Sequence, residues 1–316
     1  MKIHKLVLAA AVLFLTAFAF AACGDDGNGD TTLATSTPAA SESLYPLTIE
    51  QRDGVDLVLD EAPQRIVSLS PYATEILCEI GADDQLAAVD LFANCPSGGT
   101  DKPELDSFEP NLEAIAGFEP DLVYVDGEGI LEALREIDIQ VLYLTLPSSL
   151  DEVLERISEF GLIVDREAEA EALVEALTER IDAVEETVAG IEEGPRIFHE
   201  LDTTYFTVSP ESFIGDFYNI LKAQNIAAGG EGEYLQLTAE VIIDRDPEVI
   251  ILADEAAGVT IESLNDRPGW DTLTAVKEGR VCLVDPDIVS RPGPTVADGL
   301  EALAQCIYPE LFPSGG

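Results

Sequence analysis

The stretch RIVSLSPYATEILCEIG, residues Arg65–Gly81, decides the fold. Its start, Ile66–Leu69, is a short apolar and partly β-branched run, which is typical of a buried strand. The run stops before Pro71, because proline has a fixed φ and no N–H to donate, and proline suits the first turn of a helix. Apolar residues at helical spacing follow as far as Gly81, a residue that fits just past a helix end. The stretch therefore predicts strand, tight turn and helix. Such a turn forms one wall of a ligand cleft in an open α/β sheet, or simply a packing turn of a βα unit.

Strand and helix patterns alternate on both sides of this stretch. They alternate through residues 46–163 and again through 193–316, which predicts two mainly parallel sheets. Between them, residues 164–192 carry one apolar stripe, with Glu and Asp on the other faces, and predict a single long helix. We therefore expect an α/β fold with two Rossmann-like lobes, joined by one long α-helix, and a ligand cleft between the lobes. A long surface helix within one domain is the alternative.

Charge and motif content narrow the class of function. The 316 residues include 62 acidic and 16 basic side chains, a formal net charge of −46, and so negative a surface repels nucleic acid. The chain has no G-x-S-x-G elbow and no phosphate-binding P-loop, and His199 is the one histidine beyond the first residues. One histidine cannot form a metal-binding cluster. We expect a binding protein without a metal or cofactor of its own; an exported enzyme on a similar scaffold is the alternative.

The N-terminus has the pattern of a targeting segment. Residues 1–22 combine two lysines with an apolar core that is short for a membrane span, and they predict a signal peptide. The small residues before Cys23 resemble the lipobox of bacterial lipoproteins, although Phe20 stands where an aliphatic residue is usual. This resemblance implies that Cys23 is lipidated, whereas ordinary signal-peptidase cleavage is the alternative. Residues 23–45 are rich in Gly, Asp, Thr, Ser and Pro and predict a flexible tether, so we expect an extracytoplasmic protein with a lipid anchor in the membrane.

Four further cysteines are expected to form disulfides, because disulfides persist outside the cytoplasm. Four cysteines allow three pairings. Proximity along the chain favours one bridge in each lobe, Cys78 with Cys95 and Cys282 with Cys306. A zinc site is the weaker alternative, because no C-x-x-C spacing is present.

Several segments resemble one family over residues 65–309. SLSPYATEILCEIGADDQLAAVD and FEPNLEAIAGFEPDLVYV resemble the N-lobe of bacterial periplasmic solute-binding proteins of the vitamin B12 and ferric-siderophore class. SPESFIGDFYNILKAQNIA resembles the start of their C-lobe, and the final SRPGP with its following helix looks most like the cobalamin-binding members. The resemblance implies that the chain delivers a small-molecule ligand to the permease of an ABC importer. We expect it to act as a monomer.

The resemblance also implies two docking residues. In this family one acidic residue on each lobe meets arginines of the permease. Glu75 occupies the N-lobe position, and Asp216 occupies the C-lobe position, where Glu is usual. An ordinary surface acid is the alternative for each.

Ligand contacts are expected at the strand ends and cleft loops. A large planar ligand needs broad apolar faces and a few polar groups. Few basic residues lie near these positions, which favours a corrinoid over a ferric siderophore or haem, although these remain the alternative. The expected ligand-binding residues are Ser70, Pro71, Tyr72, Asp90, Phe92, Asn94, Asp126, Tyr205, Phe206, Trp270 and Arg291.

Overall fold

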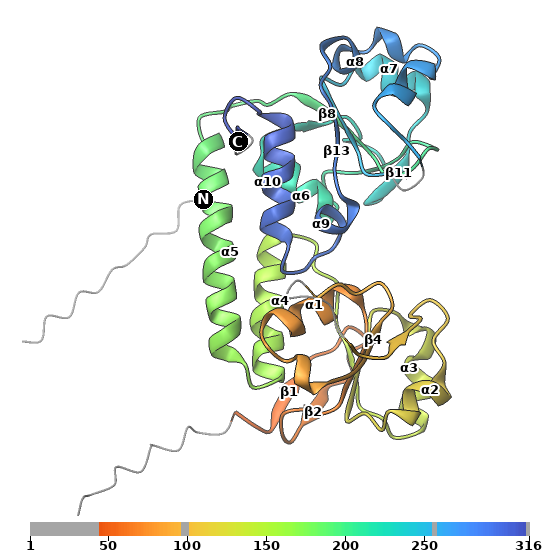
Figure 1. Cartoon of the computed structure of the whole chain (residues 1–316), viewed down its shortest axis with the longest axis vertical. Helices are drawn as coiled ribbons and strands as arrows, with labels where there is room; N and C mark the ends of the chain where they lie inside the picture. The colour runs from red at the N-terminus through yellow and green to blue at the C-terminus, as the bar shows by residue number, and fades with distance from the viewer. Residues whose placement is uncertain (1–43, 96–100, 255–257, 314–316) are drawn as a thin grey trace, which may run out of the picture. The chain divides into compact units, whose positions relative to one another are not determined.

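Five parallel strands form the sheet of the N-terminal lobe in a computed structural model that describes residues 44–95, 101–254 and 258–313 (Figure 1). Their order is β5-β4-β3-β6-β7, and every neighbouring pair is parallel. The strands are β3 (Ile66–Leu69), β4 (Leu86–Asp90), β5 (Glu104–Leu105), β6 (Leu122–Val125) and β7 (Val141–Tyr143). The helices of this lobe are α1 (Pro71–Glu79), α2 (Leu112–Gly117), α3 (Leu131–Glu136) and α4 (Leu150–Ile163), with short 3₁₀ turns η1 (Asp83–Gln85) and η2 (Glu128–Ile130).

Helices cover both faces of this sheet, so its central strands are buried throughout. Successive residues of β3 alternate between two apolar clusters, with Ile66 in one and Val67 in the other. Leu122 and Val123 of β6 alternate in the same way. This pattern explains why the strands are continuous apolar runs in the sequence, as is usual for parallel sheets. Outside the sheet, β1 (Leu47–Ile49) and β2 (Leu57–Leu59) form an antiparallel hairpin whose loop contains Gly54, with a φ of +75°.

The C-terminal lobe repeats this logic with a smaller parallel sheet in the order β10-β8-β12-β13. Its strands are β8 (Arg196–Glu200), β10 (Gln224–Asn225), β12 (Val249–Leu252) and β13 (Val281–Leu283), and a separate antiparallel pair joins β9 (Phe206–Val208) to β11 (Tyr234–Gln236). Its helices are α6 (Phe213–Ile220), α7 (Ala239–Arg245), α8 (Thr274–Glu278), α9 (Pro286–Ser290) and α10 (Val296–Ile307), with 3₁₀ turns η4 (Glu262–Asp266) and η5 (Trp270–Thr272). The sequence did not predict α9 and β11.

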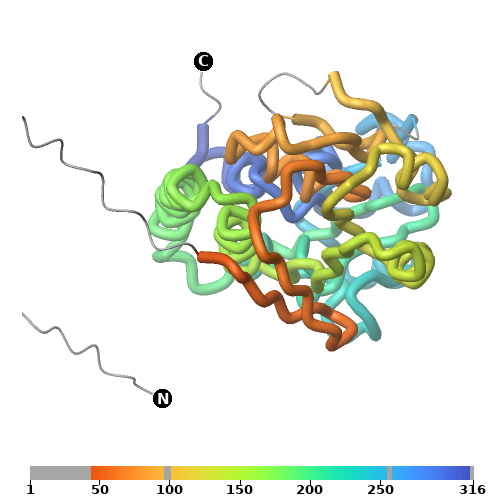
Figure 2. Tube along the Cα trace, turned by 90° about the horizontal axis from the view of Figure 1, so that it is seen from below, coloured from red at the N-terminus to blue at the C-terminus, as the bar shows by residue number. Residues whose placement is uncertain are grey.

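The predicted connecting helix is α5 (Glu167–Val188), which follows α4 and leads to β8. It lies beside α4 and α10 in both views (Figures 1 and 2). Its buried stripe joins a core cluster that also contains residues of both lobes, so the lobes and the helix share one apolar core. Gly161 allows the close approach of α4 and α5, because a Cβ there would lie 2.5 Å from the Cβ of Ala170.

Two disulfides are present, one in each lobe. Cys78 of α1 is bonded to Cys95, and Cys282 of β13 is bonded to Cys306 of α10, with Cα–Cα distances of 5.7 and 6.1 Å. Both pairings agree with the sequence prediction. The signal peptide, Cys23 and nearly all of the tether lie outside the described residues.

Candidate ligand-binding site

Two adjoining cavities lie where the strand ends of the N-terminal lobe face the C-terminal lobe. The larger cavity has a volume of about 630 Å³ and is lined almost entirely by the N-terminal lobe. The smaller cavity, of about 300 Å³, is lined by both lobes. Pro71, Asp126 and Arg291 line both cavities, so these two spaces form one site, which we call the cleft. A cleft between two α/β lobes is the arrangement that the sequence predicts.

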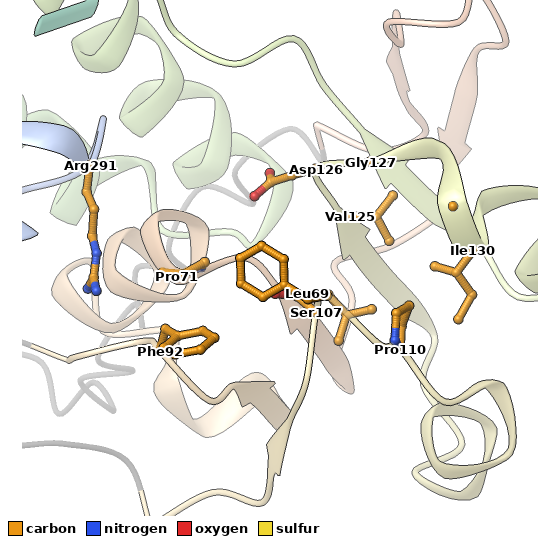
Figure 3. A pocket seen from close by; sticks show the side chains of 12 residues that line it. Leu69, Pro71, Phe92, Ser107, Pro110, Val125, Asp126, Gly127, Ile130 and Arg291 are labelled. Atoms are coloured by element: carbon orange, nitrogen blue, oxygen red, sulfur yellow. The ribbon is translucent and has the colours of Figure 1, made fainter. Parts of the chain in front are cut away.

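The larger cavity is mostly apolar and has an aromatic rim. Leu69, Pro71 and Val125 lie around it, while Asp126 comes from the end of β6 and Arg291 from the C-terminal lobe (Figure 3). Phe92 and Phe108 line the same cavity, and their rings meet edge to face with centroids 5.7 Å apart. Phe92 is 48% exposed and Phe108 is 81% exposed. Exposed aromatic faces of this kind suit a broad, flat ligand.

Arg291 is held by two carboxylates. Its guanidinium donates to Glu75 Oε1 at 2.5 Å and lies 2.9 Å from Asp287 Oδ1. Glu75 is only 3% exposed, and its Oε1 also accepts the backbone N–H of Asn94 at 3.2 Å. Burial raises the pKa of Glu75, and the positive charge of Arg291 opposes that shift. The expectation of an outward-facing Glu75 is therefore wrong, because this carboxylate joins the two lobes.

Asp216 makes a second contact between the lobes. Its carboxylate, at the start of α6, accepts the backbone N–H of Leu150 at 2.9 Å. Leu150 is the first residue of α4, so Asp216 satisfies one of the free N–H groups at that helix N-terminus. Partial burial raises the pKa of Asp216. Permease docking by Glu75 or Asp216 stays a prediction, and it requires these contacts to open.

Asp126 is the acidic group at the junction of the two cavities. It directly follows β6, and its Oδ1 is buried without a hydrogen-bond partner among the described residues. Burial raises the pKa of Asp126 to about 6, while hydrogen bonding with Ser70 and Tyr124 opposes the shift and the charge of Asp90 adds to it. Neither Asp126 nor Glu233, the other acidic residue that lines the cleft, is paired with a cation in the described ranges.

Four other predicted ligand residues lie near the cleft, and of these Tyr72 lines a cavity whereas Ser70, Asp90 and Asn94 line neither. Tyr72 lines the smaller cavity, and its hydroxyl is hydrogen-bonded to that of Tyr124. Ser70 and Asp90 are buried just beneath, at the ends of neighbouring strands. Asn94 is exposed and contacts Glu75 through its backbone, not the cavities through its side chain.

The aromatic residues predicted in the C-terminal lobe are not in the cleft. Trp270 is fully buried in the apolar core of that lobe, so it cannot touch a ligand in this arrangement. Tyr205 stacks on Trp270 at 5.6 Å, and the guanidinium of Arg267 lies 4.4 Å from the Trp270 ring centre. Phe206 is 38% exposed but lines neither cavity. The prediction of Trp270 as a ligand residue is wrong, because the apolar core of the C-terminal lobe encloses the whole side chain.

His199 gives no support to an enzyme. It is fully buried in β8, and its Nδ1 lies 2.5 Å from the hydroxyl of Tyr218. Burial lowers the pKa of His199 to about 3, so the ring is neutral at physiological pH. Among the described residues, His199 lines neither cavity of the cleft.

Sequence reasoning missed several cleft residues. Phe108 is the most exposed of the large apolar side chains in the described residues, and it lies in the loop between β5 and α2. An isolated aromatic in this otherwise polar loop, just before Pro110, was the available signal. The other missed lining residues include Leu146, Pro147, Phe213, Tyr234 and Pro292.

The described residues contain no group of three or more His, Cys, Asp or Glu side chains placed to hold a metal ion. None of their helices is both long and apolar enough to cross a membrane.

Two α/β lobes with a mostly apolar cleft between them define a protein that binds a small molecule. The chain belongs to the periplasmic binding protein family, whose model matches residues 66–288. It is 29% identical over 312 residues to an uncharacterized ABC transporter substrate-binding lipoprotein of Bacillus subtilis, covering 96% of this chain and 97% of the relative. It is 26% identical over 276 residues to a cobalamin-binding protein of Halobacterium salinarum, covering 84% and 74%. The structure of a possible iron-binding periplasmic solute-binding protein of Staphylococcus epidermidis superposes with a TM-score of 0.70 at 28% identity, covering 78% of this chain and 100% of that one.

Proposed function

We propose that this chain is the substrate-binding component of an ABC importer and that its ligand is a corrinoid. The observation that carries the proposal is the cleft, an apolar cavity with an aromatic rim whose arginine is already neutralised by carboxylates. The relatives in Bacillus subtilis and Halobacterium salinarum, named as a substrate-binding lipoprotein and a cobalamin-binding protein, support it.

The charge of the cleft favours a corrinoid over an anionic chelate. Ferric catecholates and haem carry negative groups that need several Arg or Lys partners. Arg291 is the cationic residue that lines the cavities of the described part, and Glu75 and Asp287 hold it. Asp126 and Glu233 add further negative charge to the lining. A corrin ring with neutral side chains fits this balance, because it offers a large apolar face and little negative charge.

A ferric siderophore or haem is the second candidate. The similarity to the possible iron-binding protein of Staphylococcus epidermidis favours it. Such a ligand would have to take Arg291 from Glu75, at the cost of leaving a buried carboxylate unpaired.

Calorimetry on the purified chain tests the proposal. Cyanocobalamin should bind at micromolar concentration or tighter, whereas haem and a ferric hydroxamate should bind at least tenfold more weakly. Phe92→Ala should weaken binding about tenfold, because an aromatic contact contributes roughly 1.5 kcal/mol. Phe206→Ala is the matched control, an exposed aromatic outside both cavities, and should leave affinity unchanged. No heat with cyanocobalamin refutes the corrinoid, and tight binding of an iron chelate supports the second candidate.

The proposal includes a lipid anchor at Cys23 and transfer of the ligand to a permease, without catalysis. Detergent phase separation of cells that express the full chain tests the anchor. The wild type should partition with the detergent, and Cys23→Ala should move to the aqueous phase. Equal partition of both proteins would contradict the anchor and leave the ligand proposal untouched.

A further inference from the structure

Arg291 and its partner Glu75 differ in their access to the cleft. Arg291 lines both cavities, and it is the cationic residue among their described lining residues, whereas Glu75 lines neither cavity. The side chain of Arg291 is 18% exposed and that of Glu75 is 4% exposed. Figure 3 shows the Arg291 side chain extending into the site from the C-terminal lobe. A ligand in the cleft therefore meets the guanidinium, while the carboxylate that pairs with it stays shielded.

The carboxylate partners of Arg291 leave it no surplus positive charge. Its guanidinium donates to Glu75 Oε1 at 2.5 Å and lies 2.9 Å from Asp287 Oδ1. The three groups together are negative, because two carboxylates face one guanidinium. A ligand carboxylate that approached Arg291 would meet both of these negative groups at short range, and like charges at such a distance oppose binding.

Glu75 is the partner that dominates this balance, because it is buried and held in place. Its Oε1 also accepts the backbone N–H of Asn94 at 3.2 Å, so two donors fix the carboxylate. The side chain of Asp287 is 59% exposed, and water screens its charge. The charge of Glu75 is screened much less, since it lies away from solvent.

We propose that Glu75 is a specificity-determining residue, which acts through Arg291 and excludes ligands that would place a carboxylate there. The inference deepens the proposed function and rests on the part of it that makes the cleft the ligand site. Arg291 has more N–H groups than its two carboxylate partners occupy, so it can still donate to a neutral acceptor such as a carboxamide oxygen. The pair thus favours neutral oxygen acceptors over anions.

Glu75→Gln tests the inference, because this change removes charge and little else. Both hydrogen bonds of Glu75, from Arg291 and from Asn94, end on Oε1. The amide oxygen of Gln can accept both bonds in the same place. Calorimetry compares haem, which carries carboxylates, with cyanocobalamin, which is neutral overall. Haem should bind the variant about tenfold more tightly than the wild type, because hydrogen bonds between charged groups are the strong ones. The affinity for cyanocobalamin should stay within about twofold, since a neutral ligand gains little from the uncovered charge.

Two further variants separate this local effect from general charge. Glu301→Gln is the matched control, because Glu301 also pairs with an arginine, Arg180, but lies on α10 and lines neither cavity. It removes the same charge from the chain and should leave the affinity for haem within about twofold, since distant surface charges are screened. Adding Arg291→Met to Glu75→Gln should abolish the gain for haem, because the uncovered cation is then absent. Circular dichroism and melting temperature confirm that each variant is folded.

The outcomes distinguish this inference from the corrinoid proposal. A gain for haem that requires Arg291 supports the role of Glu75. Unchanged affinity for haem in Glu75→Gln, or no binding of haem by either protein, overturns that role and leaves the corrinoid proposal to the cyanocobalamin measurement. Equal changes for both ligands also overturn it, because the variant would then have altered the shape of the cleft. Failure of cyanocobalamin to bind the wild type refutes the corrinoid, and the haem measurements still decide the role of Glu75.

Discussion

Removal of Arg291 should cost the protein much of its stability, and the loss should depend on pH. Among the described residues, Arg291→Met leaves Glu75, which is 3% exposed, with the backbone N–H of Asn94 as its remaining donor. Breaking a buried ion pair by deleting one partner costs about 3–5 kcal/mol, because the other charge stays buried. Asp287 also loses its partner, but its side chain is 59% exposed and adds little.

The pH dependence follows from the direction of the pKa shift of Glu75. Burial already raises this pKa, and loss of the guanidinium removes the group that opposes the shift. When the pKa of a carboxyl is higher in the folded state than in the unfolded state, the free energy of unfolding falls as the pH rises from the unfolded-state pKa through the folded-state pKa. The cost of Arg291→Met should therefore be larger at pH 7 than at pH 5, where more of the variant's Glu75 is protonated.

Urea unfolding at both pH values measures this loss. Arg180→Met is the control, since Arg180 pairs with Asp298 and Glu301 on the surface and its loss should cost about 0–1 kcal/mol. The double variant Glu75→Leu with Arg291→Met should recover most of the stability, because both charges of this pair are then absent. A loss below 1 kcal/mol at both pH values, or additive effects in the double variant, would refute the reasoning.

Three further predictions concern the cleft and its support. Asp126→Asn should raise the free energy of unfolding at pH 7 by at most about 3 kcal/mol, because burial raises the pKa of Asp126 from 3.8 to about 6 and folding then disfavours the charged carboxylate. Urea unfolding at pH 4 should show little gain. A loss of stability at pH 7 would contradict the argument. Replacing Cys78 and Cys95 by Ser should lower the free energy of unfolding by about 3 kcal/mol, because the bridge closes a loop with a sequence separation of 17 and so restricts the unfolded chain. An unchanged urea midpoint would show that the bridge does not restrain the unfolded chain. Phe108→Ala should leave the melting temperature unchanged, because the ring is 81% exposed, and should weaken cyanocobalamin binding about tenfold by calorimetry; unchanged affinity would place the ligand away from the rim.

Local patterns in the sequence were sufficient for the main elements of the fold. The apolar run before Pro71 became β3, and the stripe within residues 164–192 became α5, because strand and helix periodicity depends on nearby residues. The short elements α9 and β11 were missed. They have too few residues to show a period, and β11 exists through its pairing with β9.

The roles of single side chains depended on contacts that no local pattern shows. Glu75 was expected at the surface, but its partner Arg291 lies 216 positions further along the chain. Trp270 suggested a ligand platform, yet the packing of the C-terminal lobe encloses it. Asp126 and Phe92, which follow the ends of β6 and β4, do line the larger cavity, because the end of a parallel strand is a position that topology fixes, and their contact with the ligand stays a prediction.

The core shared by α5 and both lobes has a kinetic consequence. Large hinge closure around a ligand would separate packed side chains, so capture should proceed with little backbone movement. Association with a preformed cleft then varies little from one ligand to another, and selectivity is expressed as residence time. Bound ligands should therefore differ mainly in how slowly they leave the cleft.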